Sequence, residues 1–232
     1  MDRACPLQQE LTQRIEGALR VKMGAVNCRL VNEKGMSVAM RRSGWASKDT
    51  RGVIGFQVGK HVYVREDTPW TVLHELIHRS GVNGDRLNRY VAEGLTEAIA
   101  LELKRSSKEH RPTYPAETAW VQTELLPRLG MTAVQLGSAL AKVKNAPRVL
   151  ADMLTDKDGG LDRVKLEREL QPQRPEKPTI GSASCFAPTR YGSTDQPPSL
   201  DRRRGIGHLV LQLALVGGAA LVLPKAAERF LP

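Results

Sequence analysis

Two histidines separated by three residues are the feature of this sequence that points most directly to chemistry. In His74-Glu75-Leu76-Ile77-His78 the histidines are four apart, so on a helix they share one face and both imidazoles can reach one metal ion. Glu75 lies about 100° further round the helix, beside the ion rather than on it. There its carboxylate can deprotonate a metal-bound water, which is general-base chemistry. With 5 histidines in 232 residues, about 0.007 such H-E-x-x-H patterns are expected by chance.

A catalytic metal site of this kind needs a third protein ligand, and the next predicted helix offers two carboxylates. Zinc (Zn2+) is the expected ion because it accepts histidine and carboxylate ligands and lowers the pKa of its water to roughly 7. Glu93 and Glu97 are four residues apart, so one can bind the metal while the other steadies a ligand histidine. Both assignments stay open. We prefer Glu93, because Gly94 after it allows close helix packing, and find little support for Asp85 or His110.

These two segments together resemble the site of gluzincin-type zinc metallopeptidases, the thermolysin-like and peptidase-MA-like group. In that group a glutamate on the following helix, often within an E-G-x-x pattern, completes the site, and Glu93-Gly94-Leu95-Thr96 matches this pattern. The resemblance covers residues 52–105. It implies a zincin-like domain in which the zinc ligands are His74, His78 and Glu93 and the general base is Glu75. It also implies that Glu97 steadies a ligand histidine without binding the zinc itself.

The resemblance also implies a protein or peptide substrate. No G-x-M-E-N sequence stands upstream, which favours an endopeptidase over an aminopeptidase, and no metzincin continuation follows the motif. The family also uses a tyrosine or histidine to stabilise the oxyanion, for which Tyr114, His110 and Tyr90 are candidates that spacing does not separate. An edge strand, either 52–58 or 61–64, is expected to pair with extended substrate or to be an ordinary sheet strand.

The elements that must position these residues follow from hydrophobic periodicity and turn residues, and they predict an α+β fold. An amphipathic helix is expected from about residue 7 to Gly24, followed by short strands and a Gly59-Lys60 turn. Thr68 and residues 83–85 are expected to cap the two helices that carry the site. The predicted strands lie at 26–30, 52–58 and 61–64, and the predicted helices at 69–81, 86–105, 116–128, 132–144, 146–155 and 163–170.

The end of the chain differs in composition from the rest. We expect the zincin-like metallopeptidase domain at 1–156, a short helix and proline-rich flexible linker at 157–204, and a hydrophobic C-terminal helix at 205–232. The uncharged segment 206–223 is long enough to associate with or anchor to a membrane, or to dock on a partner. Residues 156–167 faintly resemble a calcium loop, but Asp162 as a helix cap explains the same residues.

Composition limits the remaining alternatives. The net charge of +10 is spread along the chain and aromatic content is 4%, which favours a mildly basic surface over a nucleic-acid platform. A basic nucleic-acid-associated protein and a catalytically inactive zincin-like binding module are the alternative functions. Cys5, Cys28 and Cys185 predict no disulfide framework and favour a reducing compartment. No secretory signal is expected at the N-terminus, so we expect a cytoplasmic or membrane-anchored protein.

Overall fold

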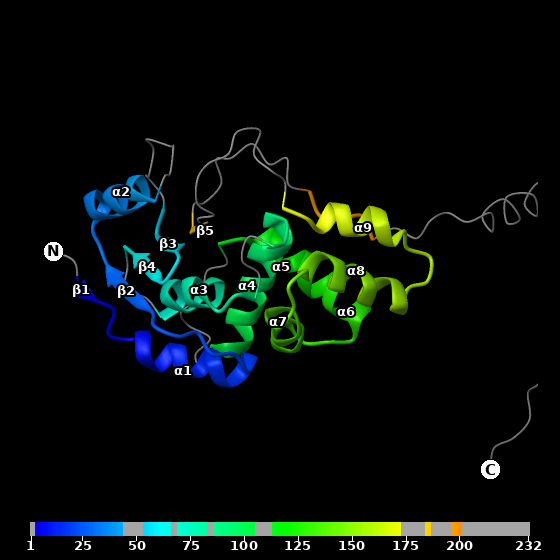
Figure 1. Ribbon diagram of the computed structural model, residues 1–232, viewed down its shortest axis with the longest axis horizontal. Coiled ribbons are helices and arrows are strands. Elements are labelled where there is room, and N and C mark those ends of the chain that lie inside the picture. The colour runs from blue at the N-terminus through cyan, green and yellow to red at the C-terminus, as the bar shows by residue number, and fades with distance from the viewer. Residues whose placement is uncertain are drawn as a thin grey trace, which may run out of the picture.

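The structure, a computed structural model, describes residues 3–43, 53–65, 69–82, 86–104, 113–172, 184–186 and 196–200. Helices and one small sheet make up this part of the chain, which agrees with the α+β prediction (Figure 1). The strands are β1 Arg3–Ala4, β2 Asn27–Leu30, β3 Gly55–Val58, β4 His61–Val64 and β5 Ser184–Phe186. The helices are α1 Gln8–Leu19, α2 Glu33–Arg42, α3 Pro69–Arg79, α4 Arg89–Leu103, α5 Pro115–Trp120, the π-helical η2 Val121–Leu125, α6 Leu126–Leu129, α7 Ala133–Ala141, α8 Ala146–Lys157 and α9 Arg163–Leu170.

The sheet has the strand order β1-β2-β4-β3-β5. β2 and β4 run parallel, whereas β3 is antiparallel to both β4 and β5. Gly59 and Lys60 form the predicted turn between β3 and β4, with Gly59 at a φ of +53° that favours glycine. β4 lies between β2 and β3, and β3 lies between β4 and β5, so neither 61–64 nor 52–58 is a free edge strand here. The alternative of an ordinary sheet strand describes both.

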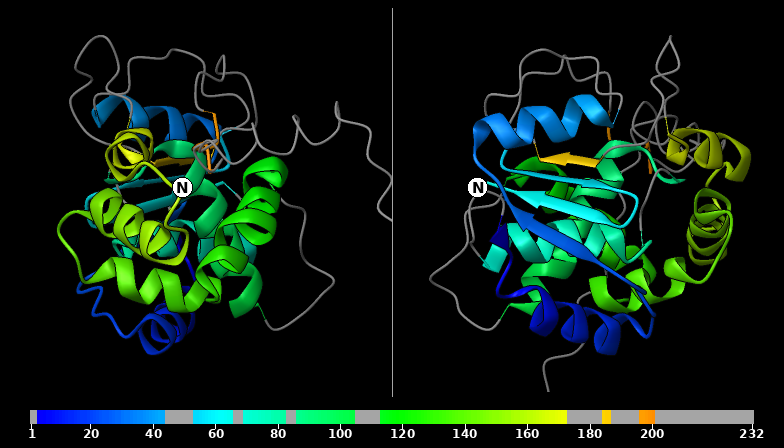
Figure 2. Two further views of the ribbon diagram at one scale, coloured as in Figure 1. Left: turned by 90° about the vertical axis from the view of Figure 1, so that its right-hand side faces the viewer. Right: turned by 60° about the vertical axis from the view of Figure 1, so that its left-hand side comes forward.

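Helices cover both faces of this sheet (Figure 2). Alternation along the strands explains why, since successive side chains point to opposite faces. Val62 and Val64 of β4 join the main core with α3 and α1, while Phe56 of β3 packs in a second core with α2. Sequence reading missed α2, whose Met36 and Met40 are fully buried.

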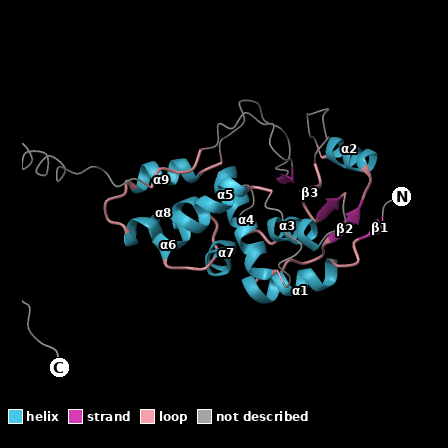
Figure 3. Cartoon of the chain, turned by 180° about the vertical axis from the view of Figure 1, so that it is seen from behind, coloured by secondary structure: helices cyan, strands magenta, loops and turns pink. Residues whose placement is uncertain are grey.

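α3 lies between the sheet and α4, at the centre of the fold (Figures 1 and 3). Its residues from Trp70 to His78 are all buried. The two predicted helices around the site are therefore present as α3 and α4, and the sheet packs directly on the helix that carries the H-E-x-x-H motif. Gly81 follows α3 at a φ of +80°, a left-handed conformation typical of a helix end.

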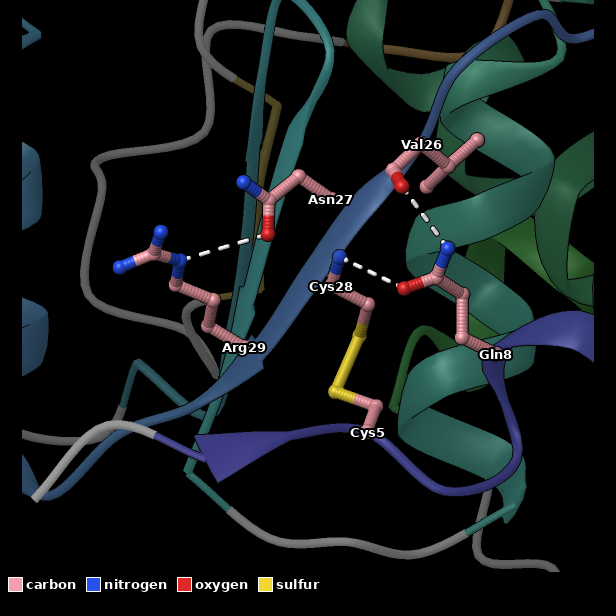
Figure 4. Close-up of a disulfide and its surroundings, with 6 residues drawn as sticks. All are labelled: Cys5, Gln8, Val26, Asn27, Cys28 and Arg29. Carbon is pink, nitrogen blue, oxygen red and sulfur yellow. Dashed lines mark hydrogen bonds between the residues drawn. A yellow bond between two sulfur atoms is a disulfide. The ribbon is translucent and has the colours of Figure 1, made fainter.

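A disulfide between Cys5 and Cys28 contradicts the expectation that the cysteines form none (Figure 4). The antiparallel pairing of β1 with β2 brings the two Cα atoms to 5.5 Å. Gln8 of α1 reinforces this junction, because its side chain donates to the Val26 carbonyl at 2.8 Å and accepts from the Cys28 amide at 3.0 Å. The expectation of a reducing compartment rested on cysteines that form no disulfide. Because Cys5 and Cys28 are paired, the cysteines no longer favour that compartment.

The C-terminal part of the described chain is more closely joined to the fold than the sequence suggests. Leu166 and Leu170 of α9 lie in the main core, beyond the boundary expected at residue 156. Asp162 caps α9 as predicted, accepting from the amides of Val164 and Lys165. Within the range of the expected linker, β5 forms a strand of the sheet and Leu200 is buried in the main core.

Other expectations fall on residues that the structure does not describe. The Thr68 cap, the cap at 83–85 and the hydrophobic helix at 205–232 with its membrane segment 206–223 all lie outside the described residues. Among the described helices, none has the length and apolarity needed to cross a bilayer.

Candidate metal centre

Three side chains from α3 and α4 converge on one point in the protein interior. The Nε2 atoms of His74 and His78 are 3.0 Å apart, and Glu93 Oε2 lies 3.3 Å from the first and 3.1 Å from the second. The two histidines meet because they are one turn apart on α3. Glu93 reaches them from α4, which packs against α3. All three are buried, and their atoms are grouped closely enough to hold one metal ion.

The electrostatics of this cluster suit a metal ligand set. Burial lowers the pKa of His74 from 6.5 to about 4, even though its hydrogen bond with Glu93 acts in the opposite direction. The imidazole is therefore neutral at physiological pH, with a nitrogen lone pair available to a metal. Burial alone would raise the pKa of Glu93, but the adjacent His78 and the hydrogen bonds from both imidazoles hold it well below its usual value. Glu93 is therefore ionised, as a ligand must be.

The structure separates the roles of the two candidate glutamates. Glu93 contacts the Nε2 atoms that face each other, whereas Glu97 Oε2 lies 3.7 Å from Nδ1 on the other side of the His74 ring. Glu97 Oε1 accepts a hydrogen bond from the Thr113 amide at 2.8 Å. Burial raises the pKa of Glu97 to about 7, and this backbone bond partly opposes the rise. Glu97 therefore lies on the Nδ1 side of His74 and outside the group of atoms that could hold one metal ion.

Glu75 lies on the side of α3 that faces β3. Its side chain is fully buried, and neither carboxylate oxygen has a hydrogen-bond partner within the described structure. Burial raises the pKa of Glu75 well above its usual value, and the charge of Glu93 adds to the rise. Burying a carboxylate without a hydrogen-bond partner costs folding free energy. Its position next to the metal-ligand cluster therefore indicates that a water molecule or a bound ligand is its partner.

Gly55 makes room for this carboxylate. A Cβ atom at position 55 would lie 2.5 Å from Glu75 Oε1 and 2.9 Å from its Cδ. Sequence reading placed Gly55 in a strand but gave it no role, although a glycine inside a strand often marks the close approach of another group. The absence of a side chain at position 55 therefore leaves the space that the Glu75 carboxylate occupies between β3 and the motif helix.

Tyr114 is the oxyanion candidate that the fold brings to the site. Its ring stacks on His74 with a centroid separation of 5.9 Å, and it is 5% exposed. Burial raises the pKa of Tyr114 well above 10, and Glu93 adds to the effect. Tyr90 packs edge-on against Trp120 instead. His110 and Asp85 lie outside the described residues.

The N-terminus of α4 is anchored by a residue that sequence reading overlooked. Asn88 caps the helix by accepting from the Val91 amide at 2.9 Å. Its own amide donates to the Leu170 carbonyl at 2.8 Å, and its side-chain amide donates to the Glu169 carbonyl at 2.6 Å. An asparagine directly before an apolar helix is a recognisable cap signal. These bonds fix the start of α4, and with it the position of Glu93, against the end of α9.

Gly94 confirms the close helix packing that was expected beside Glu93. A Cβ at this position would lie 2.5 Å from the backbone oxygen of Glu117 in α5.

Comparison of the chain with protein-family models, curated proteins and solved structures finds no match. The geometry of the site therefore carries the functional argument by itself: a buried His-His-Glu group that could hold a metal ion, with an unpartnered carboxylate beside it.

Proposed function

We propose that this protein is a zinc-dependent peptidase with a zincin-like domain. The observation that carries the proposal is the convergence of His74, His78 and Glu93 next to a buried carboxylate, Glu75, that makes no hydrogen bond within the described structure. Two imidazoles and one carboxylate are a ligand set that zinc accepts, and three protein ligands leave a position for water or substrate. The unpartnered oxygens of Glu75 supply the second requirement, a base next to that position.

Each side chain has a distinct task in this proposal. A zinc ion held by the three ligands would lower the pKa of a water molecule and polarise a substrate carbonyl. Glu75 would accept a proton from the attacking water on a carboxylate oxygen and would donate it to the leaving amide nitrogen. Glu97 holds the Nδ1 side of His74, so that Nε2 keeps its direction. Tyr114, whose ring stacks on His74, would donate a hydrogen bond to the developing oxyanion.

The test is hydrolysis of fluorescein-labelled casein by the zinc-loaded protein. Wild type should cleave the casein, and Glu75→Gln, which keeps the shape of the side chain but removes the base, should lose at least about 100-fold in rate. The matched control is Glu102→Gln, a glutamate on α4 whose carboxylate instead accepts from the amides of Ala133 and Val134. Inactivity of the zinc-bound protein with Glu75 in place, persisting after β5 is displaced from β3, would refute the peptidase proposal.

A metal-binding module without peptidase activity is the second candidate. The observation in its favour is burial, because His74 and Glu75 are fully buried and Glu93 is 4% exposed. A substrate cannot reach these atoms in this conformation. The two functions differ in one result: the module binds zinc in a His78-dependent manner but cleaves no peptide under any condition, including after displacement of β5 from β3.

A further inference from the structure

The edge of the sheet next to the metal centre is occupied by a distant segment of the same chain. β5 pairs antiparallel with β3 in the register Gly55–Phe186, Phe56–Cys185 and Gln57–Ser184. Figure 2 shows β5 lying along the outer side of β3, at the end of the sheet opposite β1. A separation of more than 120 residues makes this a non-local contact, with no turn to impose it.

This edge lies directly beside the proposed general base. Gly55 pairs with Phe186 on one side and with Val64 on the other, and the same glycine touches the Glu75 carboxylate. A strand paired with β3 at this position therefore runs past Glu75. An extended peptide binds a free sheet edge in the same manner, by main-chain hydrogen bonds that require little side-chain identity.

We propose that Ser184–Phe186 occupies, in cis, the strand position at which β3 binds an extended peptide, and so keeps the metal centre closed. The inference rests on the proposed function, since it assigns a regulatory role to the edge of that same site. It agrees with the exposure of the site in this structure, where β5 is paired, His74 and Glu75 are fully buried and Glu93 is 4% exposed. An extended peptide from another molecule must displace β5 before it can pair with β3.

The expected size of the effect follows from competition for one edge. A tethered segment acts at an effective concentration of about millimolar, so even a weak three-residue pairing can hold the edge most of the time. If the edge is free for about a tenth of the time, the apparent Kd of a peptide is raised about tenfold. Releasing β5 should therefore tighten peptide binding about tenfold, without any change in the site itself.

Proline substitutions test this in the full-length, zinc-loaded protein. Neighbouring residues of a strand point their amide hydrogens in opposite directions, so one of the two residues Cys185 and Phe186 donates to β3. Proline has no amide hydrogen, so one of the two substitutions, Cys185→Pro or Phe186→Pro, must remove that hydrogen bond. The control is Cys185→Ser, which keeps the backbone amide. The probe is a fluorescein-labelled peptide of sequence Gly-Ser-Ala-Ser-Ser-Phe-Ala, measured by fluorescence anisotropy in the Glu75→Gln background so that it is not cleaved.

At least one proline variant should bind the peptide about tenfold more tightly than the parent, while Cys185→Ser should bind like the parent. Unchanged binding in both proline variants would overturn the inference, and so would an equal gain in Cys185→Ser, which would assign the effect to the thiol. Peptide binding is measured in the Glu75→Gln background and does not depend on catalysis. A proline variant could therefore bind the peptide more tightly and yet, with Glu75 restored, fail to cleave casein. That result would support the strand proposal and refute the peptidase.

Discussion

Adding one methyl group at Gly55 should inactivate the site without removing its metal. A Cβ at this position would lie 2.5 Å from Glu75 Oε1, 2.8 Å from Cγ and 2.9 Å from Cδ. Ordinary contacts begin near 3.4 Å, so the carboxylate must move by about 0.9 Å. A displacement of about 1 Å of a reacting group costs on the order of 100-fold in rate, or about 2.7 kcal/mol in activation free energy.

The assay compares casein hydrolysis, zinc content and unfolding free energy of Gly55→Ala and wild type. We expect kcat/KM to fall about 100-fold, one zinc per chain to remain, and stability to fall by about 1–3 kcal/mol from overpacking. Zinc should remain because the clash falls on Glu75 and not on the ligands. The control is Gly17→Ala on α1, where no atom lies within 4 Å of the added carbon. Full activity of Gly55→Ala with its zinc content unchanged would refute the assignment of Glu75 as the base.

Three further predictions concern the ligands, the helix packing and the disulfide. Glu93→Gln should nearly abolish zinc binding, whereas Glu97→Gln should weaken it by about 10–100-fold; isothermal titration measures both. A reversed effect would exchange their roles, and an equal effect would refute the distinction between them. Gly94→Ala should destabilise the fold by about 1–3 kcal/mol in urea denaturation because its Cβ would meet rigid backbone, and an unchanged midpoint would contradict this packing. Replacing Cys5 and Cys28 together by serine should cost about 3 kcal/mol, since the bond closes a 23-residue separation; a melting temperature equal to that of the oxidised wild type would count against the disulfide.

The local part of the site could be predicted from the sequence because helical spacing alone determines it. Residues four apart on a helix share a face, so the approach of His74 to His78 needs no knowledge of the fold. The same rule could not decide between Glu93 and Glu97, since they also share a face. The structure separates them by the direction from which α4 crosses α3, which places one glutamate at Nε2 and the other at Nδ1 of His74.

The parts that sequence reading missed depend on contacts between distant segments. The disulfide follows from the register of β1 on β2, and the role of Gly55 follows from the packing of β3 on α3. β5 is three residues long and lies within a region rich in proline and serine, so no local periodicity marks it. α2 is different, because the buried Met36, Ala39 and Met40 follow the helical period and Asn32 caps the helix; that signal was present in the sequence.

The central claim is that His74, His78 and Glu93 together hold one metal ion. The most direct measurement is the zinc-to-protein ratio, by elemental mass spectrometry, of wild type and His78→Ala after incubation with zinc and dialysis. We expect one zinc per chain in wild type and almost none in His78→Ala, with both proteins folded by circular dichroism. No zinc in folded wild type, or the same ratio in both proteins, would contradict it.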